Sequence, residues 1–349
     1  MPEPQFRHGL VLGKFYPPHA GHHHLIRTAL RRCRRVTVEV LAASVESIPL
    51  EHRMAWLAED HPTARVVGTI DDAEVDYASE EAWQAHLVPI RGLLDAPVDA
   101  VFTSDPYGAE LARRLGADWV QVDPGRTDNN VSGTAVRADL AGHWYELSAA
   151  TRAGLAARVV VLGAESTGST TLAAALAGRF GAPWVPEYGR EHTLTRPGGL
   201  TAAWRPDEFH LIVERQLAWE DRALRHTPVP LVVCDTDVLA TALWYERYLG
   251  TASAAILDRA AAHRPDLYLL TGDEIAWTDD GTRDGRHIRH AMQQRFRDTL
   301  AAGPVPWTEL TGTVGERLAA AVPLVADAVA RRTRFAAPLD QRNSPSPVG

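Results

Sequence analysis

Two histidines three positions apart are the first residues whose types and spacing suggest chemistry. They lie in GKFYPPHAGH (13–22), where His19 and His22 precede HHLIRTAL, a stretch with helical character. A helix N-terminus attracts anions, because its first backbone N–H groups lack partners within the helix and the dipole is positive there. Two imidazoles at such a place can hydrogen bond to a phosphate chain and stabilise charge that develops on it. The spacing therefore predicts a nucleotide-binding loop.

The neighbouring residues favour the same interpretation. Gly13 ends an apolar run and permits a sharp turn, Gly21 permits close approach of a phosphate, and Lys14 adds positive charge. A metal site is the alternative, because residues 22–24 are three consecutive histidines. Consecutive residues of a helix point in different directions, however, and cannot share one ion well without further ligands. We therefore expect His23 and His24 to be surface or packing residues.

This stretch resembles the GxFxPxHxGH signature of the nucleotidylyltransferase superfamily, and VSGTAVR (131–137) resembles its second motif, ISxTxxR. The resemblance implies a Rossmann-like domain whose second motif opens a helix and binds the β- and γ-phosphates of ATP. Hydroxyl groups and an arginine at a helix start suit a triphosphate. The resemblance assigns nucleotide binding to Gly13, Phe15, Gly21, Ser132 and Thr134, and catalysis to Lys14, His19, His22 and Arg137.

A second glycine-rich loop, GAESTGSTT (163–171), nearly fits the P-loop pattern GxxxxGK[ST] between an apolar run and a helical stretch. Ser169 occupies the position of the lysine that normally reaches the β- and γ-phosphates, and a serine supplies no charge. Either arginines elsewhere replace that charge, or the loop binds a nucleotide without phosphoryl transfer. The predicted nucleotide-binding residues are Gly163, Glu165, Ser166, Thr167, Gly168, Ser169, Thr170 and Thr171.

Further candidates follow the second loop. PLVVCDTD (230–237) ends an apolar strand in Asp235 and Asp237, where P-loop enzymes keep a Mg²⁺-binding or basic aspartate. Both are candidate catalytic residues whose roles stay open, and Thr170 with Asp235 is the candidate Mg²⁺ site. Residues 279–296 carry four arginines, which suit either a lid over phosphates or a solvated helix face. Candidate substrate-binding residues are Glu187 and Arg190 of VPEYGREH (185–192), together with Arg283.

Strands and helices alternate along the chain in two successive series. Apolar runs predict strands and amphipathic stretches predict helices, and their alternation indicates parallel α/β sheets. We expect a Rossmann-like nucleotidylyltransferase domain (1–152), a P-loop kinase domain (153–334) and a disordered Pro/Ser-rich tail (335–349). The predicted strands lie within 8–15, 35–44, 99–105, 119–123, 157–162, 230–237 and 266–272, and the helices within 23–33, 50–59, 109–116, 171–180 and 206–225.

Composition limits the function classes. The 349 residues carry 36 basic and 44 acidic side chains, a formal net charge of −8, which disfavours a general nucleic-acid binder. Cys33 and Cys234 form no CxxC pattern and are too few for a disulfide framework. No apolar run is long enough for a membrane span, and the N-terminus has no secretion-signal pattern. We expect a cytoplasmic protein.

The pairing of the two domains resembles the bifunctional NadR family, nicotinamide mononucleotide adenylyltransferase joined to ribosylnicotinamide kinase. Matching stretches include VFTSDPYGAELARRLGA (101–117), PEYGREH (186–192) and CDTDVLATALWYERYLG (234–250). The resemblance implies NAD synthesis and salvage, with ATP, nicotinamide mononucleotide, ribosylnicotinamide and NAD as ligands, Mg²⁺ accompanying ATP, and a homo-oligomer. Trp56 is a candidate for stacking on the nicotinamide ring.

Two other interpretations stay open. In the first interpretation, the chain transfers adenylyl groups only, and its second domain is a nucleotide sensor. Alternatively, it is a nucleotidylyltransferase for another substrate, such as pantetheine phosphate or a polyol phosphate. Some NadR proteins carry an N-terminal helix-turn-helix, but the first strand begins so early here that we expect no DNA-binding role and no nucleic-acid partner.

Overall fold

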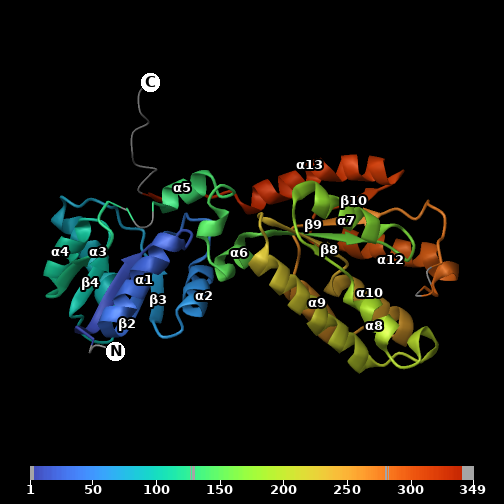
Figure 1. Ribbon diagram of the computed structural model, residues 1–349, viewed down its shortest axis with the longest axis horizontal. Coiled ribbons are helices and arrows are strands. Elements are labelled where there is room, and N and C mark those ends of the chain that lie inside the picture. The colour runs from blue at the N-terminus through green and yellow to red at the C-terminus, as the bar shows by residue number, and fades with distance from the viewer. Residues whose placement is uncertain (1–3, 126, 128–129, 280, 282, 340–349) are drawn as a thin grey trace, which may run out of the picture. The chain divides into compact units, whose positions relative to one another are not determined.

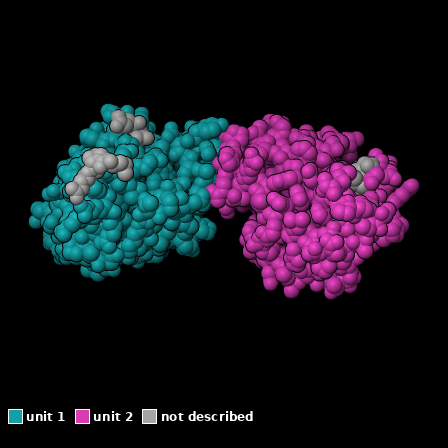
Figure 2. Space-filling model, turned by 60° about the horizontal axis from the view of Figure 1, so that its bottom comes forward, with its two compact units in different colours: residues 1–154, 334–349 teal, residues 155–333 magenta. Residues whose placement is uncertain are grey.

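The computed structural model describes the chain except residues 1–3, 126, 128–129, 280, 282 and 340–349. It consists of two compact units, residues 1–154 with 334–349, and residues 155–333 (Figure 2). Each unit is a five-stranded parallel sheet covered by helices on both faces, so the predicted α/β class with two domains is confirmed (Figure 1). Among the described residues, no helix has the length and apolar character that crossing a bilayer requires.

The first unit has the strand order β3-β2-β1-β4-β5. Alternate residues of its central strands face opposite layers of helices, because side chains of a strand alternate between the faces of the sheet. Val36 and Val38 pack with Ile26 of α1, whereas Leu10 and Val101 pack on the opposite face. The elements are β1 Phe6–Gly13, α1 Ala20–Arg32, β2 Cys33–Ala42, α2 Leu50–Asp60, β3 Arg65–Ile70, α3 Glu80–Leu93, β4 Ala100–Thr103, α4 Tyr107–Leu115, β5 Asp118–Gln121, α5 Gly133–Ala138 and α6 Ala149–Leu155.

The second unit has the strand order β10-β9-β6-β8-β7. Its central strands are apolar on both faces, which is typical of parallel strands enclosed by helices. The elements are β6 Ala157–Leu162, α7 Ser169–Phe180, β7 Trp184–Val185, α8 Tyr188–Thr195, α9 Pro206–His226, β8 Leu231–Asp235, α10 Val238–Leu249, α11 Ala254–Ala262, β9 Leu267–Thr271, α12 Arg289–Ala302, β10 Trp307–Leu310 and α13 Val314–Arg332.

Strand order places both glycine-rich loops at switch points of their sheets. β1 lies between β2 and β4, and β6 lies between β9 and β8, so the chain leaves each of these strands where the sheet order reverses. Ligands of open α/β sheets bind outside the carboxyl ends of the strands at such points. The loops after β1 and β6 are therefore where the fold itself predicts ligand sites.

The C-terminal segment differs from the sequence prediction. Residues 334–339 belong to the first unit, where Pro338 is buried and Ala336 hydrogen bonds to side chains of that unit. Disorder from residue 335 onward is therefore wrong for residues 335–339, because apolar side chains and backbone groups there find partners. The remainder of the predicted tail, residues 340–349, lies outside the described residues. Both cysteines, Cys33 and Cys234, are buried and free.

Candidate active sites

The two histidines of the first loop lie against each other at the start of α1. The backbone N–H of His19, the N-cap residue, donates to Nδ1 of His22 over 3.3 Å, and the two ring centroids are 3.7 Å apart. His22 also packs on Phe15, at 4.8 Å between centroids. The imidazoles are thus held at the N-terminal end of a 13-residue helix, where the dipole favours an anion.

The second motif lies beside the first, although the two are more than a hundred residues apart in sequence. Ser132 caps α5, its hydroxyl accepting from the N–H of Ala135 over 3.1 Å. Arg137 Nη1 donates to the carbonyl of Tyr16 over 2.8 Å. A Cβ built on Gly133 would lie 4.0 Å from Nε2 of His19. The fold therefore brings the HxGH histidines and the Ser132 helix start to one place.

A cavity of about 340 Å³ opens at this place. His24, which we expected to be a surface or packing residue, also lines it. Phe15, Thr134 and Arg137 are not among the described lining residues, and Arg137 instead lies over the Tyr16 ring at 5.2 Å. The predicted residues that do line it are Gly13, Lys14, His19, Gly21, His22 and Ser132.

Aromatic side chains that the sequence did not single out form part of the cavity wall. Tyr77 and Tyr107 stack with centroids 5.7 Å apart, and the indole N–H of Trp83 donates to the carbonyl of Tyr77 over 3.1 Å. All three line the cavity. Trp56 does not, because its indole packs against Gly154. The structure therefore corrects the prediction that Trp56 stacks on a substrate ring.

Asp71 and His86 add a polar pair to the same cavity. Their side chains approach to 2.6 Å between Oδ2 and Nδ1, and the other ring nitrogen contacts the carbonyl of Glu74 at 3.1 Å. The Asp71 carboxylate raises the pKa of His86 above its usual value. Sequence reasoning missed both residues, since each is a single polar residue without a motif.

Arg53 of α2 is hydrogen bonded to the backbone of the first loop. It is fully buried, pairs with Glu46 at 2.6 Å and donates from Nη1 to the carbonyl of Lys14 over 2.9 Å. Its guanidinium also lies 4.6 Å from the Tyr16 ring centroid. A buried ion pair is costly to break, since removing one partner leaves an uncompensated charge. Arg53 therefore holds the backbone that presents the histidines.

The second loop makes a tight turn into the start of α7. Gly168 has φ of 86°, a value that favours glycine, and Ser166 also has positive φ, 63°. A side chain at Gly163 would overlap the hydroxyl oxygens of Thr167 and Thr271, so only glycine fits. Thr167 is buried, and its hydroxyl donates to the carbonyl of Ala164. The loop is thus tightly specified, even though its lysine is missing.

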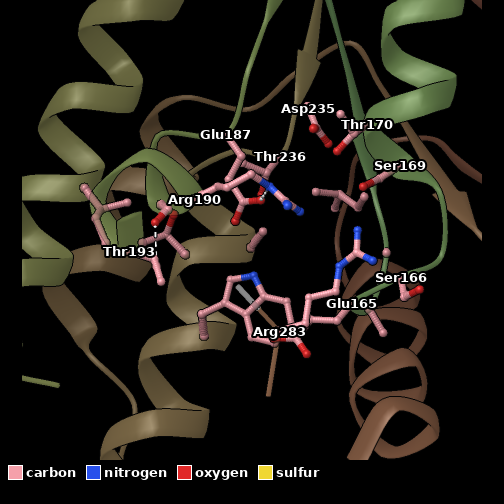
Figure 3. Close-up of a pocket in the computed structure, with 18 of the residues that line it drawn as sticks. Glu165, Ser166, Ser169, Thr170, Glu187, Arg190, Thr193, Asp235, Thr236 and Arg283 are labelled. Atoms are coloured by element: carbon pink, nitrogen blue, oxygen red, sulfur yellow. Dashed lines mark hydrogen bonds and ion pairs between the residues drawn. The ribbon is translucent and has the colours of Figure 1, made fainter. Parts of the chain in front are cut away.

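A cavity of about 150 Å³ lies in front of this loop (Figure 3). Of the predicted loop residues, Thr167 is not among those that line it, because it is buried beneath the loop. The predicted residues that line it are Gly163, Glu165, Ser166, Gly168, Ser169, Thr170, Thr171, Glu187, Arg190, Asp235 and Arg283.

The two aspartates after β8 have different surroundings. Asp235 lines the cavity beside Thr170 and Ser169 (Figure 3), and burial raises its pKa although the hydroxyl groups of these two residues oppose the rise. Asp237 is buried outside the cavity, where it caps α10 at the N–H of Ala240 and accepts from the Tyr268 hydroxyl over 2.6 Å. The prediction of a catalytic Asp237 is therefore corrected to a structural role.

Two glutamates complete the acidic side of the second cavity. Burial raises the pKa of Glu187 to about 7, the Asp235 carboxylate adds to the rise, and Arg190 opposes it from 3.9 Å. Burial also raises the pKa of Glu165, which pairs with Arg247 at 3.2 Å and accepts from the N–H of Gly285. The cavity therefore holds carboxylates whose charge is sensitive to what binds beside them.

The arginines of residues 279–296 have separate roles. Arg283 points into the cavity together with Arg190 (Figure 3). Arg289 is buried and donates to the carbonyl of Ser166 over 2.9 Å, so it braces the loop. Arg295 pairs with Glu246 at 2.7 Å. Arg317 of α13, which the sequence did not reveal, donates to the carbonyl of Thr167 over 2.6 Å.

The histidine-rich stretch shows no metal centre within the described residues. His23 is buried and contacts His61 at 2.9 Å between ring nitrogens, and burial lowers its pKa to about 3. Across the described part of the chain, no group of three or more His, Cys, Asp or Glu side chains is arranged to hold a metal ion.

The fold and the two sites define a two-unit nucleotide-binding enzyme, with an HxGH site in one unit and a P-loop site in the other. Comparisons with known proteins agree. An AAA domain family matches residues 158–317. The nicotinamide-nucleotide adenylyltransferase of Aeropyrum pernix is 31% identical over 136 residues, which are 37% of this chain and 76% of that protein. The trifunctional NAD biosynthesis/regulator protein NadR of Escherichia coli is 25% identical over 294 residues, 79% of this chain and 71% of that protein.

A crystal structure of a NadR protein in complex with NR has the same fold, with a TM-score of 0.65 and 23% sequence identity over 94% of this chain and 96% of that chain. The chain belongs to the nicotinamide-nucleotide adenylyltransferases, and it is similar to NadR proteins over most of its length. It is thus an enzyme of NAD biosynthesis and salvage.

Proposed function

We propose that the first unit transfers the adenylyl group of ATP to nicotinamide mononucleotide, giving NAD and pyrophosphate. A phosphate oxygen of the mononucleotide attacks the α-phosphate of ATP, and the bond from that phosphorus to the pyrophosphate oxygen breaks. The attacking group is already an anion, so the reaction needs positioning and charge neutralisation rather than a general base. The observation that carries this proposal is the contact between His19 and His22 beside Ser132 at one cavity.

We propose that the second unit phosphorylates ribosylnicotinamide. Its 5′-hydroxyl oxygen attacks the γ-phosphorus of ATP, and the bond from that phosphorus to the bridging oxygen breaks, which releases ADP. The product is the substrate of the first unit, which gives the joined chain a chemical purpose. Glu187 orients the hydroxyl and accepts its proton, since its raised pKa suits it to that task. Arg190 and Arg283 supply the positive charge that Ser169 lacks, because both line the cavity beside it.

Mg²⁺ fits the second site. The Thr170 hydroxyl and the Asp235 carboxylate are adjacent oxygen donors, and Mg²⁺ in such enzymes takes one or two protein oxygens with the rest from phosphates and water. When bound with ATP, the ion would neutralise phosphate charge. With Asp235 and Thr170 assigned to the ion, Glu187 remains for the substrate hydroxyl.

The test is a product analysis with the purified chain, ATP, Mg²⁺ and ribosylnicotinamide, followed by chromatography. We expect nicotinamide mononucleotide and then NAD. If NAD forms only from added nicotinamide mononucleotide, the second unit is a nucleotide sensor and the kinase proposal fails. If nicotinamide mononucleotide with ATP gives no NAD, the substrate of the first unit is another phosphate. Nicotinate mononucleotide, tested in parallel, measures the preference for the amide.

A further inference from the structure

Six residues at the end of the described chain complete the first unit. After α13 ends at Arg332, residues 334–339, here named the C-terminal strap, pack with the unit that contains the HxGH loop. The chain therefore enters the first unit twice, once at each end. A terminal segment can pack on any part of a domain surface. The contacts of the strap therefore show whether it bears on the site.

The strap contacts the HxGH loop itself. The hydroxyl of Tyr16 donates to the carbonyl of Ala336 over 3.0 Å, and the N–H of Ala336 donates to the hydroxyl of Ser47 over 3.2 Å. Tyr16 and Ser47 are themselves hydrogen bonded at 2.7 Å. The Phe335 ring meets the Tyr16 ring edge-on, with centroids 5.8 Å apart. These contacts fix both the ring and the hydroxyl of Tyr16.

Tyr16 is also the residue to which the second motif is attached. Its carbonyl accepts from Arg137, and its buried ring has guanidinium groups over it, from Arg53 at 4.6 Å and from Arg137 at 5.2 Å. The strap then continues to Leu339, which lines the cavity that His19 and Ser132 also line. The strap thus reaches the site in two ways, through Tyr16 and through its own side chain.

We propose that the C-terminal strap, residues 334–339, is a positioning element of the adenylyl-transfer site, acting through Tyr16 on Arg137 and through Leu339 on the cavity wall. The proposal rests on the function proposed for the first unit. The residue that ISxTxxR assigns to the triphosphate is held in place by Tyr16, so loss of the strap should affect ATP more than nicotinamide mononucleotide. It also follows that the first site is complete only after the second unit has been synthesised.

The experiment compares a chain ending at Thr333 with a matched control ending at Leu339. For the shorter chain we expect kcat/KM for NAD formation to fall about 10- to 100-fold, chiefly through a higher KM for ATP. The KM for nicotinamide mononucleotide and ribosylnicotinamide phosphorylation should change little, and the control should match the full chain. Equal NAD formation by both truncations would overturn the proposal.

Point variants separate positioning from folding. Tyr16→Phe keeps the ring but removes the hydroxyl that contacts the strap, so it should lower kcat/KM in the same direction. Its effect should be smaller in the chain ending at Thr333, because the contact with Ala336 is already absent there and only the contacts with Ser47 remain to be lost. Additive effects would contradict the coupling. Leu339→Ser should raise the KM for ATP and Leu339→Met should restore it, with unchanged thermal midpoints.

Hydrogen exchange keeps the two proposals distinguishable. The N–H of Ser47 donates to the Tyr16 hydroxyl over 3.0 Å, and residues 14–16 precede His19 in the first loop. Removing the strap should speed exchange in these segments whether or not the full chain makes NAD. If the full chain makes no NAD but the loop loses protection, only the proposed reaction fails. If protection is unchanged, the strap has no positioning role.

Discussion

The hydroxyl of Ser169, which occupies the lysine position of the P-loop pattern, lies beside the buried carboxyl of Asp235 and opposes the rise that burial gives to the pKa of that carboxyl. The serine thus interacts with the aspartate and, unlike a lysine, brings no positive charge to the phosphates. Arg190 and Arg283 are the basic residues among the described residues that line the same cavity. The kinase reaction should therefore depend on these two arginines.

Replacing either arginine by alanine should lower the kcat of ribosylnicotinamide phosphorylation by about 10²- to 10³-fold, the cost of losing one preorganised charge from a phosphoryl-transfer site. NAD formation from added nicotinamide mononucleotide should be unchanged, since it uses the other unit. Both rates are measured on one preparation of each variant by chromatography.

Arg286→Ala is the matched control, because Arg286 is exposed in the same segment as Arg283. It should retain full phosphorylation. Ser169→Lys introduced into the Arg283→Ala variant should restore part of the lost rate, since it returns a charge to the loop. Wild-type phosphorylation rates in both arginine variants would refute the charge replacement.

The pH dependence of phosphorylation should follow Glu187. Its pKa of about 7 means that the carboxyl is protonated below that pH and ionised above it. If the ionised form accepts the proton of the substrate hydroxyl, kcat/KM for ribosylnicotinamide rises up to about tenfold per pH unit below 7 and levels off above it. Initial rates between pH 5.5 and 8.5 give the profile.

Glu187→Gln should lower this kcat/KM and flatten the profile, because the amide does not titrate. NAD formation measured at the same pH values serves as the control for general effects of pH on the chain. A variant that keeps both the rate and the inflection would assign the inflection to another group, and the proton would then have to leave by another route.

For the first unit, His19→Ala and His22→Ala should each lower NAD formation by about 10²- to 10³-fold, the loss expected when one donor to a developing phosphate charge is removed. Phosphorylation of ribosylnicotinamide should be retained in both. His52→Ala is a suitable control, because His52 is exposed on α2. Full activity in both histidine variants would mean that the phosphates bind elsewhere.

The sequence predicts the central strands better than the edges of the sheets. β1, β2, β6, β8 and β9 read as apolar runs because helices cover both of their faces. The strands β3 and β10, which were not predicted, lie at sheet edges and are mostly half-buried, so polar residues and a glycine interrupt their pattern. Position in the sheet, which a local pattern does not contain, decides this difference.

The same distinction separates the site residues. The histidines and the P-loop glycines are found from sequence because their function requires fixed local spacing. Arg53 and Arg317 donate to loop carbonyls 39 and 150 positions away, and a pattern carries no trace of such contacts. Asp235 and Asp237 look equivalent in sequence, but β8 ends at Asp235 and Thr236 has φ of 76°, so the chain turns between them.

Buried charge in the first unit should make its stability depend on pH. Glu39 of β2 is fully buried, and within the described part of the chain neither of its carboxylate oxygens has a hydrogen-bond partner. Burial raises its pKa from 4.5 to about 8. Between these values the folded chain keeps a proton that the unfolded chain releases. Stability should therefore fall as pH rises through this range, by at most about 1.4 kcal/mol per pH unit from this residue.

Glu39→Gln should remove that contribution, because the amide stays neutral in both states. The unfolding midpoint of the first unit, measured in urea between pH 5 and 8, should fall less steeply in the variant than in the wild type. Glu51→Gln, at an exposed position of α2, should leave the wild-type slope in place. Identical slopes for Glu39→Gln and the wild type would show that Glu39 gains compensating partners when it ionises. The difference between the two glutamine variants isolates the buried carboxyl from every other group that titrates.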